Sequence, residues 1–135
     1  MKQLSDKRRQ RQAEAKALRD KLIADTGECM ICGNDYLRRM PPLNQLCCHE
    51  ILNGPLRQRV LAEPSCLIVC CWYCNGEELD HKGRWPLARQ LAVIKVKSPD
   101  RYDRERVLYL RHSNAPNFVT EDEVDAWIIR EDARK

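Results

Sequence analysis

Four of the eight cysteines in this 135-residue chain fall into two Cys-x-x-Cys pairs, Cys29 with Cys32 and Cys71 with Cys74. Such pairs are typical ligands of tetrahedral zinc, because the two-residue spacing brings both sulfurs to one side of a tight turn. The pattern therefore predicts one structural Zn²⁺ site with four thiolate ligands. Cys70 adjoins Cys71 and is a competing ligand, but Cys71 keeps the two-residue spacing.

His49 lies between the two pairs, shortly before an Asn53-Gly54 turn signal. A neutral imidazole there could accept a proton from a water molecule that attacks a phosphodiester. A divalent cation opposite the imidazole would neutralise the charge that develops on the leaving oxygen. His49 is therefore a candidate general base. The alternative is that it is a hydrogen-bonded core residue, as most single histidines are.

Four cysteines remain once the first zinc site is filled: Cys47, Cys48, Cys66 and Cys70. They could form a second metal site with His49 as an alternative ligand. They could equally be small apolar side chains of the core, which is a common role of buried thiols.

The elements that must position these residues alternate between helix and strand. Ser5 is a candidate cap for a helix that continues to about Asp25 and is ended by Gly27. Strands are expected at 46–52 and 66–70, the second of them buried on both faces, and a helix is expected to start near Asn75. Further helices are expected from Pro86 to residue 95, over 102–110, and from Thr120 onward.

The basic residues are concentrated in the N-terminal segment. Residues 1–24 contain eight basic and three acidic side chains, a net charge of +5, whereas the whole chain has +4, so the remainder sums to −1. This asymmetry favours an anionic partner, most simply nucleic acid, over a merely solvated helix face. The candidate phosphate contacts are Lys7, Arg8, Arg9, Arg11, Arg57 and Arg59.

The sequence also indicates the cellular compartment in which we expect the protein. The chain starts Met1-Lys2-Gln3-Leu4 without the apolar segment of a secretory signal, and no apolar run approaches the length of about 20 residues needed to span a membrane. We therefore expect a soluble, cytoplasmic protein whose thiols stay reduced, which favours zinc over disulfides.

The order of these motifs resembles the HNH endonuclease superfamily, in particular its small phage and bacterial members with a basic helix ahead of the first Cys-x-x-Cys pair. The shared pattern is Cys-x-x-Cys, a strand carrying His49, and a second Cys-x-x-Cys followed directly by Asn75, over residues 7–82. The resemblance implies a treble-clef, ββα-metal core and metal-dependent DNA cleavage. It also implies that His49 is the general base and that Asn75, on the helix, is a ligand of the catalytic metal.

The sequence departs from the family at the residue before the general base. The family has Asp or His there as first ligand of the catalytic metal, whereas this chain has Cys48. A thiolate is a poor ligand for Mg²⁺ and a good one for zinc or another soft ion. Further along the helix, His81 is another candidate ligand. Glu50 is an alternative oxygen donor, although strand alternation points it away from His49.

Taken together, the sequence predicts an α+β protein with a small zinc-stapled core. Its segments are a basic N-terminal arm (1–26), the HNH-like core (27–84) and a C-terminal helical extension (85–135) within one compact domain. The expected function is that of a metal-dependent endonuclease or nickase, with Mg²⁺, Mn²⁺, Ni²⁺ or Zn²⁺ as the second ion and DNA as substrate. The alternative is a catalytically inactive zinc module that binds nucleic acid or a partner protein; a homodimer is a further candidate state.

Overall fold

The computed structural model describes residues 5–33, 41–52, 60–80, 85–111 and 119–133. These residues form five α-helices and one two-stranded sheet, so the predicted mixture of helix and sheet is confirmed. Several predicted features lie outside the described residues: the Asn53-Gly54 turn, Arg57, Arg59 and His81.

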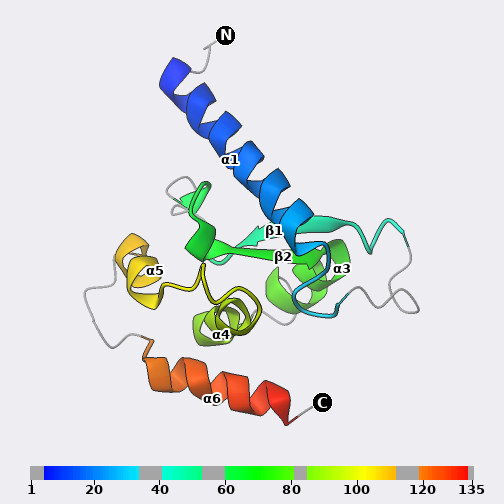
Figure 1. The fold of residues 1–135 in the computed structure, drawn as a ribbon, viewed down its shortest axis with the longest axis vertical. Coiled ribbons are helices and arrows are strands. Elements are labelled where there is room, and N and C mark those ends of the chain that lie inside the picture. The colour runs from blue at the N-terminus through cyan, green and yellow to red at the C-terminus, as the bar shows by residue number, and fades with distance from the viewer. Residues whose placement is uncertain (1–4, 34–40, 53–59, 81–84, 112–118, 134–135) are drawn as a thin grey trace.

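Helix α1 (Asp6–Thr26) begins and ends where its capping residues predict. The Ser5 side chain accepts a hydrogen bond from the amide of Arg8 at 3.2 Å, and Gly27 adopts a left-handed conformation (φ 71°) past the C-terminus. All residues from Ser5 to Glu14 are exposed, and only Ala15 and Leu22 of the helix are buried. The N-terminal half of α1 therefore projects from the body of the molecule (Figure 1).

Strands β1 (Leu46–Glu50) and β2 (Leu67–Cys71) form an antiparallel pair in which His49 lies opposite Ile68 and Cys47 opposite Cys70. Every residue of β2 is buried, as the sequence predicts for its apolar run. Successive side chains of a strand point to opposite faces. The two faces of β1 therefore carry Cys47 and His49 on one side, and Leu46, Cys48 and Glu50 on the other.

The chain continues from β2 directly into helical structure. Helix α3 (Trp72–Cys74) is one turn long and is followed by a wider π-helical segment, η3 (Asn75–Asp80). The helix expected near Asn75 thus begins three residues earlier, at Trp72, and changes its winding at Asn75. Asn75 is the first residue of the wider segment, immediately after the last cysteine of the second pair.

The helices lie on both faces of the hairpin. Figure 1 shows α1 on one side of the two strands and α4 (Leu87–Lys97) on the other, with α6 (Glu121–Asp132) packed beyond α4. Helix α5 (Arg104–Leu110) lies beside them. The predicted boundaries are close to these, and a complete capping box between Thr120 and Glu123 marks the start of α6.

One hydrophobic cluster connects all three predicted segments, with buried members from Leu22 of α1 to Val124 of α6. The last turn of α1 and the C-terminal helices therefore share a core with the central hairpin. Among the described helices, none is both long and apolar enough to cross a membrane.

Two valines test where this core lies. Val69 on β2 is fully buried, whereas Val96 on α4 is 49% exposed. We expect Val69→Ala to lower the free energy of unfolding by roughly 2 kcal/mol, because it removes two buried methyl groups and leaves a cavity. Val96→Ala should change it by less than about 0.5 kcal/mol. Urea unfolding of both variants provides the measurement, and equal effects would contradict the described packing.

Candidate metal centre and the buried histidine

The two Cys-x-x-Cys pairs come together at one end of the hairpin. The sulfurs of Cys29, Cys32, Cys71 and Cys74 all lie within 4.8 Å of one another, and those of Cys32 and Cys71 are 3.7 Å apart. A tetrahedral zinc ion with bonds of about 2.3 Å separates its sulfur ligands by about 3.8 Å. These four residues therefore fit the group that their spacing predicts, and Cys71 rather than Cys70 completes the cluster.

Local backbone structure positions these sulfurs. Gly33 adopts a positive φ of 65°, which closes the first turn, and the amides of Ile31 and Cys32 donate to the Cys29 sulfur at 3.4 Å. The Met30 amide donates to the Val69 carbonyl at 2.9 Å, which fixes this turn against the open edge of β2. The second pair needs no separate support, because Cys71 ends β2 and Cys74 lies in α3.

The cluster favours the charged form of at least one thiol. A hydrogen bond from the Cys74 thiol, followed by hydrogen bonds from backbone amides, lowers the pKa of Cys29 to about 4. The same hydrogen bond raises the pKa of Cys74. A thiolate with donors directed at it is the form of cysteine that binds metal ions.

His49 is buried, with 6% of its surface exposed, and both ring nitrogens have partners. Its Nδ1 lies 3.0 Å from Oδ1 of Asn75, and its Nε2 lies 2.9 Å from Oε1 of Gln90 on α4. The histidine and the asparagine that the resemblance pairs are thus in contact across 26 residues of sequence. The imidazole is enclosed by two amide side chains.

Cys48 does not join this group. It lies on the opposite face of β1 from His49, and its sulfur faces the Arg19 carbonyl of α1 at 3.9 Å. Burial raises the pKa of Cys48 to about 11, so the thiol stays protonated at neutral pH. Of the three predicted ligands of a catalytic metal, the structure therefore brings Asn75 to His49, turns Cys48 away, and does not describe His81.

Of the two alternatives for the four remaining cysteines, the described residues favour core side chains over a second metal site. Among the described residues, Cys29, Cys32, Cys71 and Cys74 form the one cluster of three or more His, Cys, Asp or Glu side chains that could hold a metal ion. Cys47 and Cys70 face each other across the strands, whereas Cys48 faces α1 and Cys66 precedes β2. None of the eight cysteines, all of which lie in described residues, forms a disulfide. The four outside the cluster are core or partly buried side chains.

Four basic residues lie on the exposed N-terminal half of α1. Lys7, Arg8, Arg9 and Arg11 are all exposed on the projecting half of the helix. Where α1 reaches the body, Arg19 forms an ion pair with Glu50 that ties the helix to β1. A cleft of about 570 Å³ lies between α1 and β1, and Lys16, Arg19 and Cys48 are among the residues that line it.

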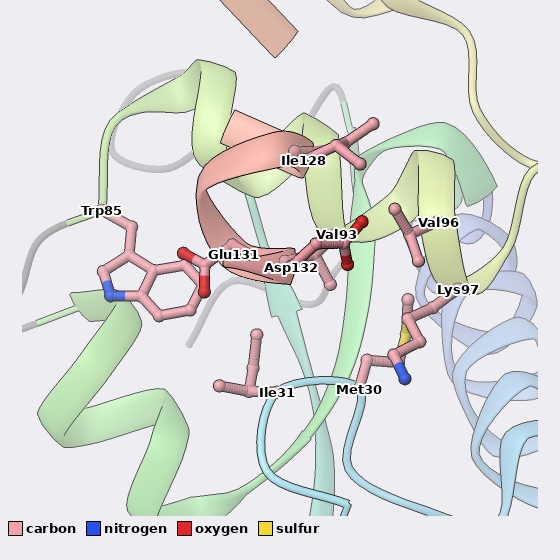
Figure 2. Close-up of a pocket in the computed structure, with 10 residues that line it drawn as sticks. Met30, Ile31, Trp85, Val93, Val96, Lys97, Ile128, Glu131 and Asp132 are labelled. Carbon is pink, nitrogen blue, oxygen red and sulfur yellow. The ribbon is translucent and has the colours of Figure 1, made fainter. Parts of the chain in front are cut away.

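A second hollow, of about 270 Å³, opens between the first Cys-x-x-Cys turn, α4 and α6. Figure 2 shows its largely apolar wall, with Met30 and Ile31 opposite Val93, Val96 and Ile128. None of the predicted site residues lines it. The hollow and the histidine site are therefore separate features of the molecule.

Gln90 is the site residue that the sequence analysis missed. The sequence predicts only that it lies in the helix from Pro86 to residue 95, whereas in the structure it is 7% exposed and contacts His49. The neighbouring residues could have indicated its position. Leu91, Ala92 and Ile94 are buried on the same helix, so a polar residue at position 90 lies at the border of the apolar face.

Comparison with known proteins adds no assignment: no family model, no curated protein and no solved structure matches this chain.

Adjacent cysteines provide a direct test of the metal centre. Cys70 and Cys71 are both fully buried, but only Cys71 belongs to the cluster. We expect purified wild-type protein to contain one zinc ion per chain, Cys71→Ser to lose zinc and unfold, and Cys70→Ser to keep it. Zinc analysis and far-ultraviolet circular dichroism measure both effects. Zinc loss from the Cys70 variant alone would show that the ligand set is different.

Proposed function

We propose that this protein is a DNA endonuclease or nickase of the HNH type, built on a zinc-stabilised treble-clef core, with His49 as the general base. The observation that supports this proposal best is the contact between His49 on β1 and Asn75, the residue directly after the second Cys-x-x-Cys pair, at 3.0 Å. The hairpin, the helix that follows it and the four-cysteine cluster have the order that the resemblance implies.

In the proposed reaction the imidazole takes a proton from water as the water oxygen attacks phosphorus. The bond from phosphorus to the leaving oxygen breaks, and that oxygen is protonated by solvent. For the water to reach His49, it must replace one of the two amides on the ring. Asn75 is the replaceable partner, because the amide of Gln90 is also held by the Trp85 carbonyl at 2.8 Å.

The described residues do not assemble the metal site that this class of enzyme uses. Asn75 is the one predicted ligand beside His49, and Cys48 lies on the opposite strand face. A divalent cation bound there would stabilise charge on the leaving oxygen.

The projecting half of α1 supports DNA as the substrate. Four exposed basic residues follow one another within residues 7–11, on a helix whose other end is fixed to β1 through Arg19 and Glu50. A charged helix with almost no buried surface of its own fits the phosphate backbone, which binds through charge rather than through base sequence.

A second candidate function is a non-catalytic zinc module that binds nucleic acid. The observation that favours it is the saturation of His49, whose two nitrogens are both engaged by side-chain amides in a buried setting. That arrangement is also what a purely structural histidine needs. The two functions differ in whether DNA that is bound is also cut.

Plasmid nicking by the wild type and by His49→Ala separates them. With Mg²⁺, Mn²⁺, Ni²⁺ or Zn²⁺ added in turn, we expect the wild type to nick supercoiled DNA and the variant to lose at least about 100-fold in rate, because a general base contributes roughly 10²–10⁴-fold. His49→Asn retains a polar side chain in the same place and controls for loss of the fold. If the wild type binds DNA but cuts with none of these ions, the non-catalytic module is the correct function.

DNA affinity tests the helix independently of cleavage. We expect the triple variant Arg8→Ala, Arg9→Ala, Arg11→Ala to bind duplex DNA more weakly for every sequence. The slope of log affinity against log salt should become shallower by up to about 2.7, because each phosphate contact contributes about 0.9. Lys16→Ala is the control on the same helix, since the Lys16 ammonium is already paired with Asp20 at 2.7 Å. An unchanged slope in the triple variant would remove α1 from the DNA-binding surface.

A further inference from the structure

Gln90 connects the C-terminal extension to the histidine. It lies on α4, beyond the part of the chain that the HNH resemblance covers, and its side chain is 7% exposed. One end of its amide faces His49 Nε2 at 2.9 Å, and the other end donates to the Trp85 carbonyl at 2.8 Å. Both ends of this buried amide are therefore used, as a buried polar group requires.

The second hydrogen bond fixes which way the amide faces. A backbone carbonyl accepts hydrogen bonds and cannot donate them, so the group directed at Trp85 must be the NH₂ of Gln90. The amide oxygen is then the group opposite His49 Nε2. Because that oxygen only accepts, Nε2 must carry a proton.

The proton on Nε2 decides the state of the other nitrogen. In a neutral imidazole the remaining nitrogen, Nδ1, holds a lone pair and faces Asn75. In the described orientation Oδ1 of Asn75 lies 3.0 Å from Nδ1. Because the two ends of an amide have nearly the same shape, a half-turn of this amide directs its NH₂ group at the lone pair on Nδ1 of the neutral ring. Nδ1 is the nitrogen that can take up a proton, and it is the one on the Asn75 side.

We infer that Gln90 is a positioning residue that holds His49 as the Nε2-protonated tautomer and so makes Nδ1 the nitrogen that accepts the proton from water. The catalytic half of this inference rests on the proposed function, whereas the tautomer does not. The C-terminal extension then does more than cover the zinc-stabilised core: through one amide it sets the orientation of the ring.

The experiment uses the zinc-loaded full chain with ¹⁵N-labelled histidine, whose ring nitrogens report the tautomer by NMR. We expect Nε2–H in the wild type. Gln90→Glu keeps an oxygen opposite Nε2 and should keep the tautomer, although it loses the donor to Trp85. Gln90→Met fills a similar volume without an acceptor, so we expect a mixture of tautomers and nicking slower by about 10–100-fold, the range seen when a metal-binding histidine loses the partner that orients it.

Thermal unfolding of both variants separates positioning from structure. Each variant loses the hydrogen bond to Trp85, so a purely structural role predicts that both are impaired in proportion to their loss of stability. A positioning role predicts that Gln90→Glu retains the tautomer and more of the nicking rate than Gln90→Met at similar stability.

Two results would overturn the inference: an Nδ1–H tautomer in the wild type, or an unchanged tautomer in Gln90→Met. A wild-type protein that shows Nε2–H but does not nick DNA would overturn the endonuclease and the catalytic role of Nδ1, while leaving Gln90 as the partner that fixes the ring. The NMR measurement therefore tests the tautomer assignment, and the nicking assay separately tests the proposed function.

Discussion

The four-cysteine cluster is the constraint on which the rest of the structure depends. It joins the turn after α1 to the end of β2 and to the first turn of α3, three segments that span 46 residues from Cys29 to Cys74. A two-stranded hairpin is marginal by itself, and one turn of helix is too short to be stable alone. Binding of a metal ion contributes directly to folding in such small cores. Because Asn75 follows Cys74 directly, the same cluster fixes the backbone that carries Asn75 to His49.

A second constraint is that both nitrogens of the buried His49 imidazole need hydrogen-bond partners. Removing a polar ring from water is unfavourable unless its nitrogens find partners, and a fully connected network is what makes such burial stable. Here the partners come from two directions, Asn75 from the segment after α3 and Gln90 from α4. The packing of α4 against β2 brings Gln90 to His49, which couples the C-terminal helices to the candidate site.

The features that the sequence predicted correctly are those that depend on residues close together in the chain. Ser5 and Gly27 delimit α1, Thr120 with Glu123 starts α6, and the Cys-x-x-Cys spacing identifies the four clustered thiols. The orientation of Cys48 could also have been predicted from the sequence. Alternation along a strand points Glu50 away from His49, and the same rule applies to Cys48, the residue just before His49. The contact between Gln90 and His49 could not be predicted from the sequence in this way. Its partner lies 41 residues away, and no local pattern specifies that contact.

A histidine that is buried and hydrogen-bonded can still act as a general base. The change needs only the small free energy of exchanging one of its hydrogen bonds for a hydrogen bond to water. Exchanging the Asn75 hydrogen bond for one to water costs on the order of 1 kcal/mol, the net worth of a typical hydrogen bond. That is small beside the contribution of a general base, which at about 10²–10⁴-fold corresponds to roughly 3–5 kcal/mol. The partner on the other side must stay, since a ring free to turn would lose its orientation. In the proposed reaction the amide of Gln90, held at both ends, would supply that asymmetry by fixing Nε2, while the Asn75 amide would give way to water at Nδ1.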